Sequence, residues 1–112
     1  MILNNNFNPS TTTNGAYVSL PGGLKICWKS SCMTSNINGY FRQAKVTFPI
    51  AFSSAPTVVA NIFEGWGNSA TETRVTCKVV AASTTGATIY VGDSGGQLAN
   101  INAVIAYIAI GK

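Results

Sequence analysis

Side chains that can do chemistry are few in this sequence of 112 residues. It has no histidine, and its side-chain carboxylates are Glu64, Glu72 and Asp93. Acid–base catalysis near neutral pH usually relies on histidine or on a carboxylate pair with a shifted pKa. Glu64 with Glu72 or Asp93 is the remaining pair for a glycosidase, but polysaccharide-degrading enzymes usually need a larger scaffold with an extended groove. Because serine and cysteine nucleophiles also lack a histidine partner, we expect no enzymatic activity.

The three cysteines, Cys27, Cys32 and Cys77, form an odd set. Disulfide-rich secreted domains normally have an even number at higher density. The spacing of Cys27 and Cys32 fits no common zinc motif, and no histidine completes a site. The run DSGGQ at 93–97 offers one carboxylate, whereas calcium prefers several oxygen ligands. We expect free, largely buried thiols, no metal and no cofactor; a functional disulfide is the alternative.

The net charge of +4 comes from seven basic residues that are spread along the chain, no two of them adjacent. Nucleic-acid binding usually requires a concentrated basic patch, so we expect no nucleic-acid partner. A weak attraction to an anionic polysaccharide or a bacterial surface fits this charge at least as well.

The strongest candidate for ligand binding is the loop that holds Trp66 between two glycines. An exposed indole ring can stack on the apolar face of a sugar, while Glu64 and Asn68 supply hydrogen bonds to its hydroxyl groups. The alternative is that Trp66 packs onto the core or a subunit interface.

Two further groups are candidates for ligand contacts. Asn36, Tyr40 and Arg42 form a polar and aromatic group, for which the alternative is a solvated loop that enters a strand. Asp93 and Gln97 belong to a glycine-containing loop. Trp28 lies within a predicted strand, and we expect it in the core.

The elements that position these residues are strands. Val, Ile and Thr total 31 residues, against 17 for Leu, Glu, Lys, Arg, Gln and Met together, and this excludes a helical bundle. Turn signals separate short runs of strand-forming residues. The expected strands are 16–20, 24–29, 40–50, 57–63, 74–81, 87–91 and 101–110. About seven short strands predict an all-β fold, an antiparallel β-sandwich, over residues 16–112.

The last predicted strand is apolar on both faces. The two-residue period places Ala103, Ile105, Tyr107 and Ala109 on one face and Val104, Ala106, Ile108 and Ile110 on the other. One face of an antiparallel strand usually meets water. In a domain this small, the second face predicts cover by another copy of the chain and hence a homo-oligomer. The alternative is a central strand that the chain's own loops cover.

Residues 1–15 are polar and irregular, and we interpret them as a lead-in segment that joins the domain to something upstream. The sequence has no signal-peptide pattern at its start. Its longest apolar stretch has the length of a strand, so no membrane insertion is expected.

Three segments, taken in order, resemble the C-terminal receptor-binding (tip) domains of bacteriophage and prophage tail fibres. Residues 17–28, YVSLPGGLKICW, are similar to the family hairpin Tyr-x-x-Leu-Pro-Asn/Gly-Gly-Leu-x-Ile-x-Trp. Residues 46–58 hold VTFPIAF and then PTV, and residues 106–111, AYIAIG, match the family ending. The chain departs from the pattern at Cys27 and Lys29 and by an insert over 30–34. The second segment is also similar to H-type lectin domains.

The resemblance implies a homotrimer at the end of a fibre, with residues 1–15 continuing from the shaft. Such a protein is made in the bacterial cytoplasm, belongs to the virion and binds a glycan or an outer-surface protein of the host. The alternatives are a stand-alone, sugar-binding H-type lectin and a structural domain that terminates or trimerises a fibre without contacting a receptor.

Overall fold

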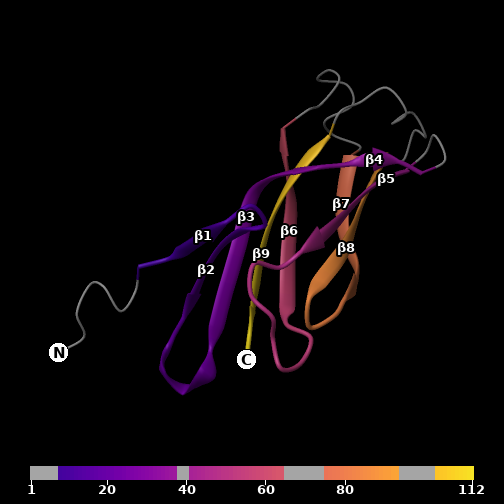
Figure 1. The fold of residues 1–112 in the computed structure, drawn as a ribbon. Helices are drawn as coiled ribbons and strands as arrows, with labels where there is room; N and C mark the ends of the chain where they lie inside the picture. Colours follow the sequence, from indigo (N-terminus) through magenta and orange to yellow (C-terminus); the bar gives the residue numbers. More distant parts are fainter. Residues whose placement is uncertain (1–7, 38–40, 65–74, 94–102) are drawn as a thin grey trace.

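The computed structural model describes residues 8–37, 41–64, 75–93 and 103–112. Most of the β-branched residues in these ranges lie in strands. A five-stranded antiparallel sheet has the order β1(Ser10–Thr12), β2(Gly15–Ser19), β3(Lys25–Met33), β9(Val104–Gly111), β6(Thr57–Glu64). A four-stranded antiparallel sheet has the order β4(Ser35–Asn36), β5(Phe41–Thr47), β8(Gly86–Asp93), β7(Val75–Ala82). The all-β, sandwich-like fold expected from the composition is confirmed (Figure 1).

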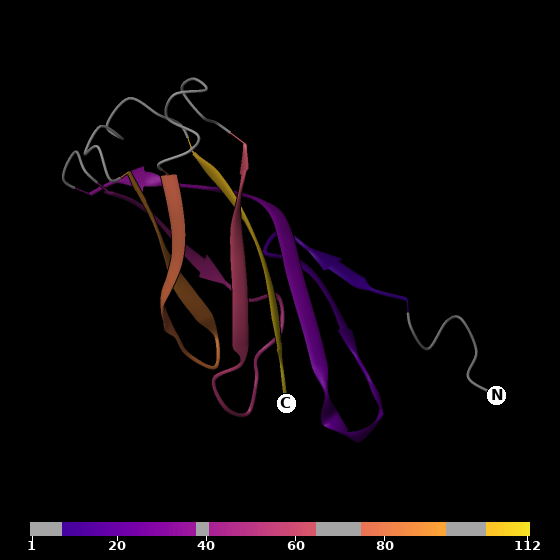
Figure 2. The same ribbon diagram turned by 180° about the vertical axis from the view of Figure 1, so that it is seen from behind.

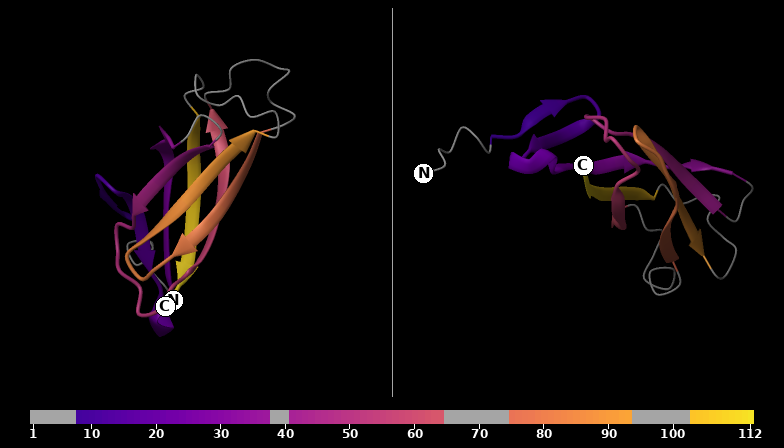
Figure 3. Two further views of the ribbon diagram at one scale, coloured as in Figure 1. Left: turned by 90° about the vertical axis from the view of Figure 1, so that its right-hand side faces the viewer. Right: turned by 90° about the horizontal axis from the view of Figure 1, so that it is seen from below.

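The two sheets pack face to face. Figure 2 shows the strands of the four-stranded sheet (below, the shorter sheet) beside β6 and β9, while β1 and β2 lie at the far edge of the five-stranded sheet. Seen from the side of the shorter sheet, β5, β8 and β7 lie in front of β9 and β6 (Figure 3, left). Both sheets contribute to one core, which includes Cys27, Ala44, Ile89, Val91, Ile105, Tyr107 and Ala109.

The segment between β5 and β6 closes one end of this core with aromatic rings. Phe48 lies 5.4 Å from Phe52 and 5.8 Å from Tyr107, between ring centroids. Backbone N–H groups of Phe48 and Phe52 donate to carbonyls of the β7–β8 turn, over 2.8 and 2.9 Å. A Cβ on Gly111 would stand 3.2 Å from Pro56, so the close approach of the chain end to this segment favours glycine there.

The last strand is central to its sheet. β9 pairs with β3 on one side and with β6 on the other. Ile105 and Ala109 on its inner face are fully buried, whereas Ile108 and Ile110 on its outer face are 54% and 40% exposed. The predicted division of its faces is therefore confirmed, and the described residues of the chain leave the outer apolar face partly uncovered.

Several boundaries differ from the expected ones. β3 continues to Met33, beyond the expected end at residue 29, because pairing with β9 resumes after an irregularity between Lys29 and Cys32. Residues 1–15 contain the short strand β1, which adds to the edge of the sheet through β2. The described residues thus hold nine strands rather than about seven. Within these residues, no helix is long or apolar enough to span a membrane.

The expected position of Trp28 is wrong. Trp28 pairs with Ile108, so its side chain belongs to the outer face of the five-stranded sheet, where it is half-buried. The inner position on β3 goes to Cys27, which is fully buried. Alternation along β3 allows only one of these two neighbours to face the core, and the thiol is the smaller.

All three cysteines are free, as expected, and Cys27 and Cys32 are buried. They pair with Ala109 and Ile105, which stand four positions apart on β9. At about 3.3 Å per residue this separates them by roughly 13 Å. Because a disulfide requires Cα atoms within about 7 Å, these two cysteines do not bond to each other.

We predict that Cys27 is chemically inert in the folded protein. Burial raises its pKa from 9.0 to about 11, and the nearby Tyr107 hydroxyl and Ala109 backbone oppose this increase only in part. The thiolate fraction at pH 8 is then about a hundredfold lower than for a free thiol. Iodoacetamide labelling followed by peptide mass spectrometry should show Cys27 unmodified in the native protein and modified in urea. Rapid native labelling would contradict the burial.

The same burial gives the folded protein a preference for the neutral thiol. The unfolded chain releases this proton near pH 9 and the folded protein near pH 11. The contribution of the buried, neutral Cys27 thiol to the free energy of unfolding is therefore complete below pH 9, and it is lost as the pH rises toward 11.

Candidate functional site

The strand ends that flank the candidate binding segments meet at one end of the sandwich. Phe41 at the start of β5 pairs with Gly92 near the end of β8. Val75 at the start of β7 pairs with Asp93. Glu64 at the end of β6 pairs with Val104 at the start of β9. The chain therefore leaves and re-enters the sheets at this one end before and after segments 38–40, 65–74 and 94–102 (Figure 1).

We call this end of the sandwich, marked by Phe41, Glu64, Val75, Asp93 and Val104, the binding end, after the candidate binding segments that its strand ends flank. Strand ends far apart in the sequence meet there, which the sequence alone did not show. Asn36 is exposed on β4, next to Arg42 in the register of β4 and β5. Glu64 and Asp93 occupy the last positions of β6 and β8. Tyr40, Trp66, Asn68 and Gln97 lie outside the described residues, and their roles stay predictions.

Arg42 has a position that sequence reasoning did not anticipate. Its side chain is 8% exposed on the inner face of β5. Nε donates to Thr34 Oγ1 over 2.9 Å, and Nη2 donates to the Thr34 carbonyl over 2.7 Å. Thr34 Oγ1 in turn donates to the carbonyl of Ala103. Arg42 thus joins β5 to the connection between β3 and β4 and to the start of β9.

This chain of hydrogen bonds directs two Arg42 donors into the protein. Buried polar groups need such partners, because an unpaired one loses the hydrogen bonds that water would supply. The arrangement supports the ends of three strands at the binding end. The alternation of β5 explains the position, since Arg42, Ala44 and Val46 share the face that meets the core.

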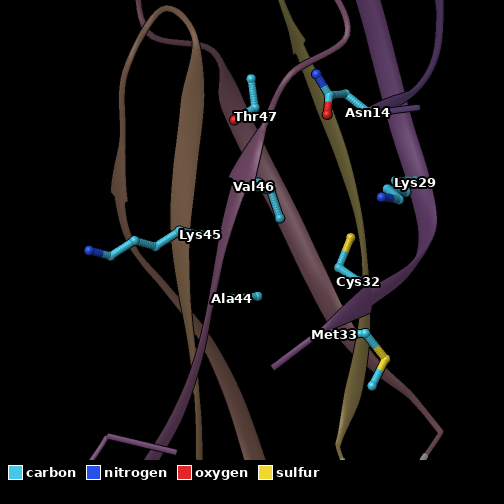
Figure 4. A pocket seen from close by; sticks show the side chains of 8 residues that line it. All are labelled: Asn14, Lys29, Cys32, Met33, Ala44, Lys45, Val46 and Thr47. Carbon is cyan, nitrogen blue, oxygen red and sulfur yellow. The ribbon is translucent and has the colours of Figure 1, made fainter. Parts of the chain in front are cut away.

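A pocket of about 180 Å³ opens where the two sheets separate, between β3 and β5 (Figure 4). Its lining residues are Asn14, Lys29, Cys32, Met33, Ala44, Lys45, Val46 and Thr47. The Lys45 side chain points away from the others. Lys29 Nζ donates to the Thr13 carbonyl over 3.2 Å, which holds β1 and β2 against this edge.

The chemistry of this pocket is weak. Burial raises the pKa of Cys32, although the positive charge of Lys29 acts in the opposite direction. A protonated thiol is a poor nucleophile and a poor metal ligand. Among the residues that the structure describes, no group of three His, Cys, Asp or Glu side chains is placed to hold a metal ion. The pocket therefore does not form a recognisable reaction centre.

A second feature is the apolar outer face of the five-stranded sheet. Val59 on β6 pairs with Ile108 on β9, which pairs with Trp28 on β3. Val59 is 65% exposed and Ile108 54% exposed. A shallow groove runs over this row, lined by Val59, Ala60, Asn61, Ala106, Tyr107 and Ile108. Sequence reasoning identified the β9 part of this face and missed Val59, whose valine-rich strand gave no sign of which side faces outward.

We predict that Arg42→Met destabilises the domain by about 2 kcal/mol, because Thr34 loses both of its partners on the guanidinium. Urea unfolding followed by tryptophan fluorescence measures the change. Lys45→Met on the same strand is the matched control, since Lys45 is exposed and should change stability by less than about 0.5 kcal/mol. Equal effects of the two substitutions would refute the role given to Arg42.

No protein-family model and no curated protein matches the chain. Among solved structures it is similar to an N-truncated R1-type pyocin tail fibre, with a TM-score of 0.67, 28% sequence identity, and coverage of 94% of this chain and 84% of that one. It is also similar to a C-terminal fragment of the R1 pyocin fibre of P. aeruginosa, with a TM-score of 0.67 and 27% identity over 94% of this chain and 28% of that one.

These neighbours agree with the resemblance carried by the hairpin, the aromatic-proline segment and the chain end. The similarity to H-type lectins stays a prediction. The resemblance to tail fibres is confirmed, because in fold and sequence this chain is similar to the tail fibre of R1 pyocin.

Proposed function

We propose that this domain is the receptor-binding tip of a tail fibre, which trimerises and binds a glycan or a protein on the host bacterium without catalysis. The observation that carries the proposal is the apolar outer face centred on β9, in a domain similar to pyocin tail fibres. In this proposal the protein is made in the bacterial cytoplasm and assembled into the virion.

The outer face is wide as well as apolar. In the register of the five-stranded sheet, Ala16, Trp28, Ile108 and Val59 form one row across four strands. Val18, Ile26, Ile110 and Thr57 form the next row. Monomeric proteins rarely leave a contiguous apolar patch of this kind in water. Burying one large aliphatic side chain contributes about 1.5–3 kcal/mol, so several together favour association.

A second copy of the chain is the natural partner for this face. Each subunit carries the same patch, and closed rotational symmetry lets every copy cover its neighbour without leaving a patch exposed. Three copies about a fibre axis satisfy this requirement and agree with the tail-fibre resemblance. The outer face of the five-stranded sheet would then point to the fibre axis, and the four-stranded sheet would point to solvent.

The binding end suits contact with a receptor. β9 runs from the binding end to the opposite end, where Ser53 N–H and Oγ donate to the Lys112 carbonyl over 2.6 and 2.7 Å. The sheets thus hold the binding end at a fixed distance from the chain terminus. Three copies on one fibre multiply weak individual contacts through their effective concentration.

The proposed trimer determines the mass of the domain in solution. Light scattering during size exclusion should give about 35 kDa, three times the 11.7 kDa of one chain. Ile108→Asp should reduce this to a monomer, because it places a charge in the proposed interface. Val80→Asp is the matched control, since Val80 is 39% exposed on β7 of the other sheet, and it should leave the trimer intact. A monomeric wild-type domain would contradict the proposal, and a hexamer would favour the lectin alternative.

The proposed receptor site makes binding to bacterial cells depend on Trp66. The fluorescently labelled trimer should bind some bacterial strains and not others in flow cytometry. Trp66→Ala should abolish this binding while the trimer mass stays unchanged, because the proposal assigns to Trp66 the stacking contact with the receptor. Unchanged binding would remove Trp66 from the site. Absence of binding to every strain tested would favour the structural alternative.

A further inference from the structure

The outer face of the four-stranded sheet differs from that of its partner sheet. The register of β5, β8 and β7 places Phe41, Gly92 and Thr76 in one cross-strand row. Gln43, Tyr90 and Lys78 form the next row. The third row holds Lys45 and Thr88. Aromatic, amide, hydroxyl and ammonium groups therefore share one open face, which neither the core nor the proposed trimer contact uses.

Two aromatic rings form a platform on this face. The ring centroids of Phe41 and Tyr90 lie 6.3 Å apart, with the ring planes inclined by 32°. Phe41 lies across Gly92, where an added Cβ would stand only 3.1 Å from a ring carbon. The absence of a side chain at Gly92 thus lets the Phe41 ring lie close to the sheet. Phe41 is nevertheless 43% exposed and Tyr90 half-buried, which leaves ring surface open to solvent.

Polar and cationic groups frame this platform. Gln43 on β5 and Lys78 on β7 lie directly beside Tyr90 on its two sides, about 5 Å away between Cβ atoms. Lys45 follows in the next row, and both lysines are exposed. None of the side chains that the structure describes on this face is acidic. The face is therefore positive, in line with the net charge of +4.

We propose that this face binds an acidic saccharide. A sugar ring stacks on Phe41 and Tyr90, its carboxylate or phosphate pairs with Lys78 and Lys45, and its hydroxyl groups bond to the Gln43 amide. The two exposed ammonium groups attract an anionic sugar and offer a neutral sugar no comparable attraction, so the charge and the rings together favour an anionic sugar. The inference rests on the proposed function for its biological setting, because it names the class of surface glycan that the fibre meets.

The position of the face supports this role. Phe41 and Gly92 belong to the strand positions next to the binding end, so a polysaccharide that lies along β8 would extend to this end of the sandwich. In the proposed trimer the shorter sheet points outward. Each copy then offers its platform to a different stretch of the same surface polymer.

Nuclear magnetic resonance titration of the ¹⁵N-labelled trimer tests the proposal, with tetragalacturonic acid, glucose 6-phosphate and maltotetraose as probes. The anionic probes should shift the amides of β5, β7 and β8 around Tyr90, and the neutral maltotetraose should not. Binding should weaken as NaCl rises from about 50 to 500 mM, since the contacts are between exposed charges. A stronger response to tetragalacturonic acid identifies a carboxylate ligand, and a stronger response to glucose 6-phosphate a phosphate ligand.

Variants assign the contacts. The double substitution Lys45→Gln and Lys78→Gln should weaken anionic binding about fivefold or more. Lys112→Gln is the control for the loss of one positive charge away from this face, since Lys112 is exposed at the opposite end, and it should bind like the wild type. Tyr90→Leu keeps an apolar side chain on β8 and should remove stacking; its amide spectrum reports whether the fold is intact. Equal binding of maltotetraose, or unchanged binding by the double variant, would overturn the proposal.

Cell binding separates this inference from the proposed function. If the double variant binds cells like the wild type while Trp66→Ala does not, the acidic-saccharide face is wrong and the tip function stands. If the isolated domain binds the anionic probes but no bacterial strain, the tip function is wrong and the saccharide face stands.

Discussion

Insertion of β9 between β3 and β6 is the constraint on which the rest of the structure depends. Lys25 pairs with Gly111 and Thr57 with Ile110, so the five-stranded sheet closes only when the last residues of the chain are in place. Ile105, Tyr107 and Ala109 then enter the core as one row. Pairings between residues so distant in sequence require large loops to close, and such topologies fold slowly. The core of this domain is therefore complete only when β9 is in place.

Hydrogen bonds outside the sheet hold both ends of this strand. Thr34 donates to the carbonyl of Ala103 just before β9, and Ser53 donates to the carbonyl of Lys112 just after it. Arg42 holds Thr34 in turn. These contacts fix β9 along its own axis, where a shift of one residue would exchange its core face for its outer face. The polar groups beside the core therefore specify a register that apolar packing alone would leave less certain.

The central position of β9 also gives the two sheets different outer faces. The five-stranded sheet exposes Val59, Ile108 and Ile110, which favour contact with protein. The four-stranded sheet exposes lysines and an aromatic pair, which favour contact with water and polar ligands. One face is suited to assembly and the other to solvent. This separation fits the proposed function, in which contacts between subunits and contacts with the host would use different surfaces.

Local pattern determined much of this from the sequence. β-branched residues and turn signals placed β2, β6, β7 and β8 to within about two residues, because these signals act between neighbours. Alternation along the last strand gave its two apolar faces correctly, since the period of a strand is two whatever its partners are. The hairpin, the aromatic-proline segment and the chain end, taken together and in this order, indicated the resemblance to tail fibres, because they combine residue type with order along the chain.

Only the tertiary structure decided which strands are neighbours and which side of each faces inward. Trp28 points outward because its neighbour Cys27 occupies the inner face of β3, which packs into the core. Arg42 points inward because it shares the face of β5 that carries the core residue Ala44. Phe41, Tyr90 and Lys78 come from three strands, and nothing in their separate sequences places them on one face. The physical reason is that strand propensity and alternation are local, whereas register between distant strands follows from packing the complete core.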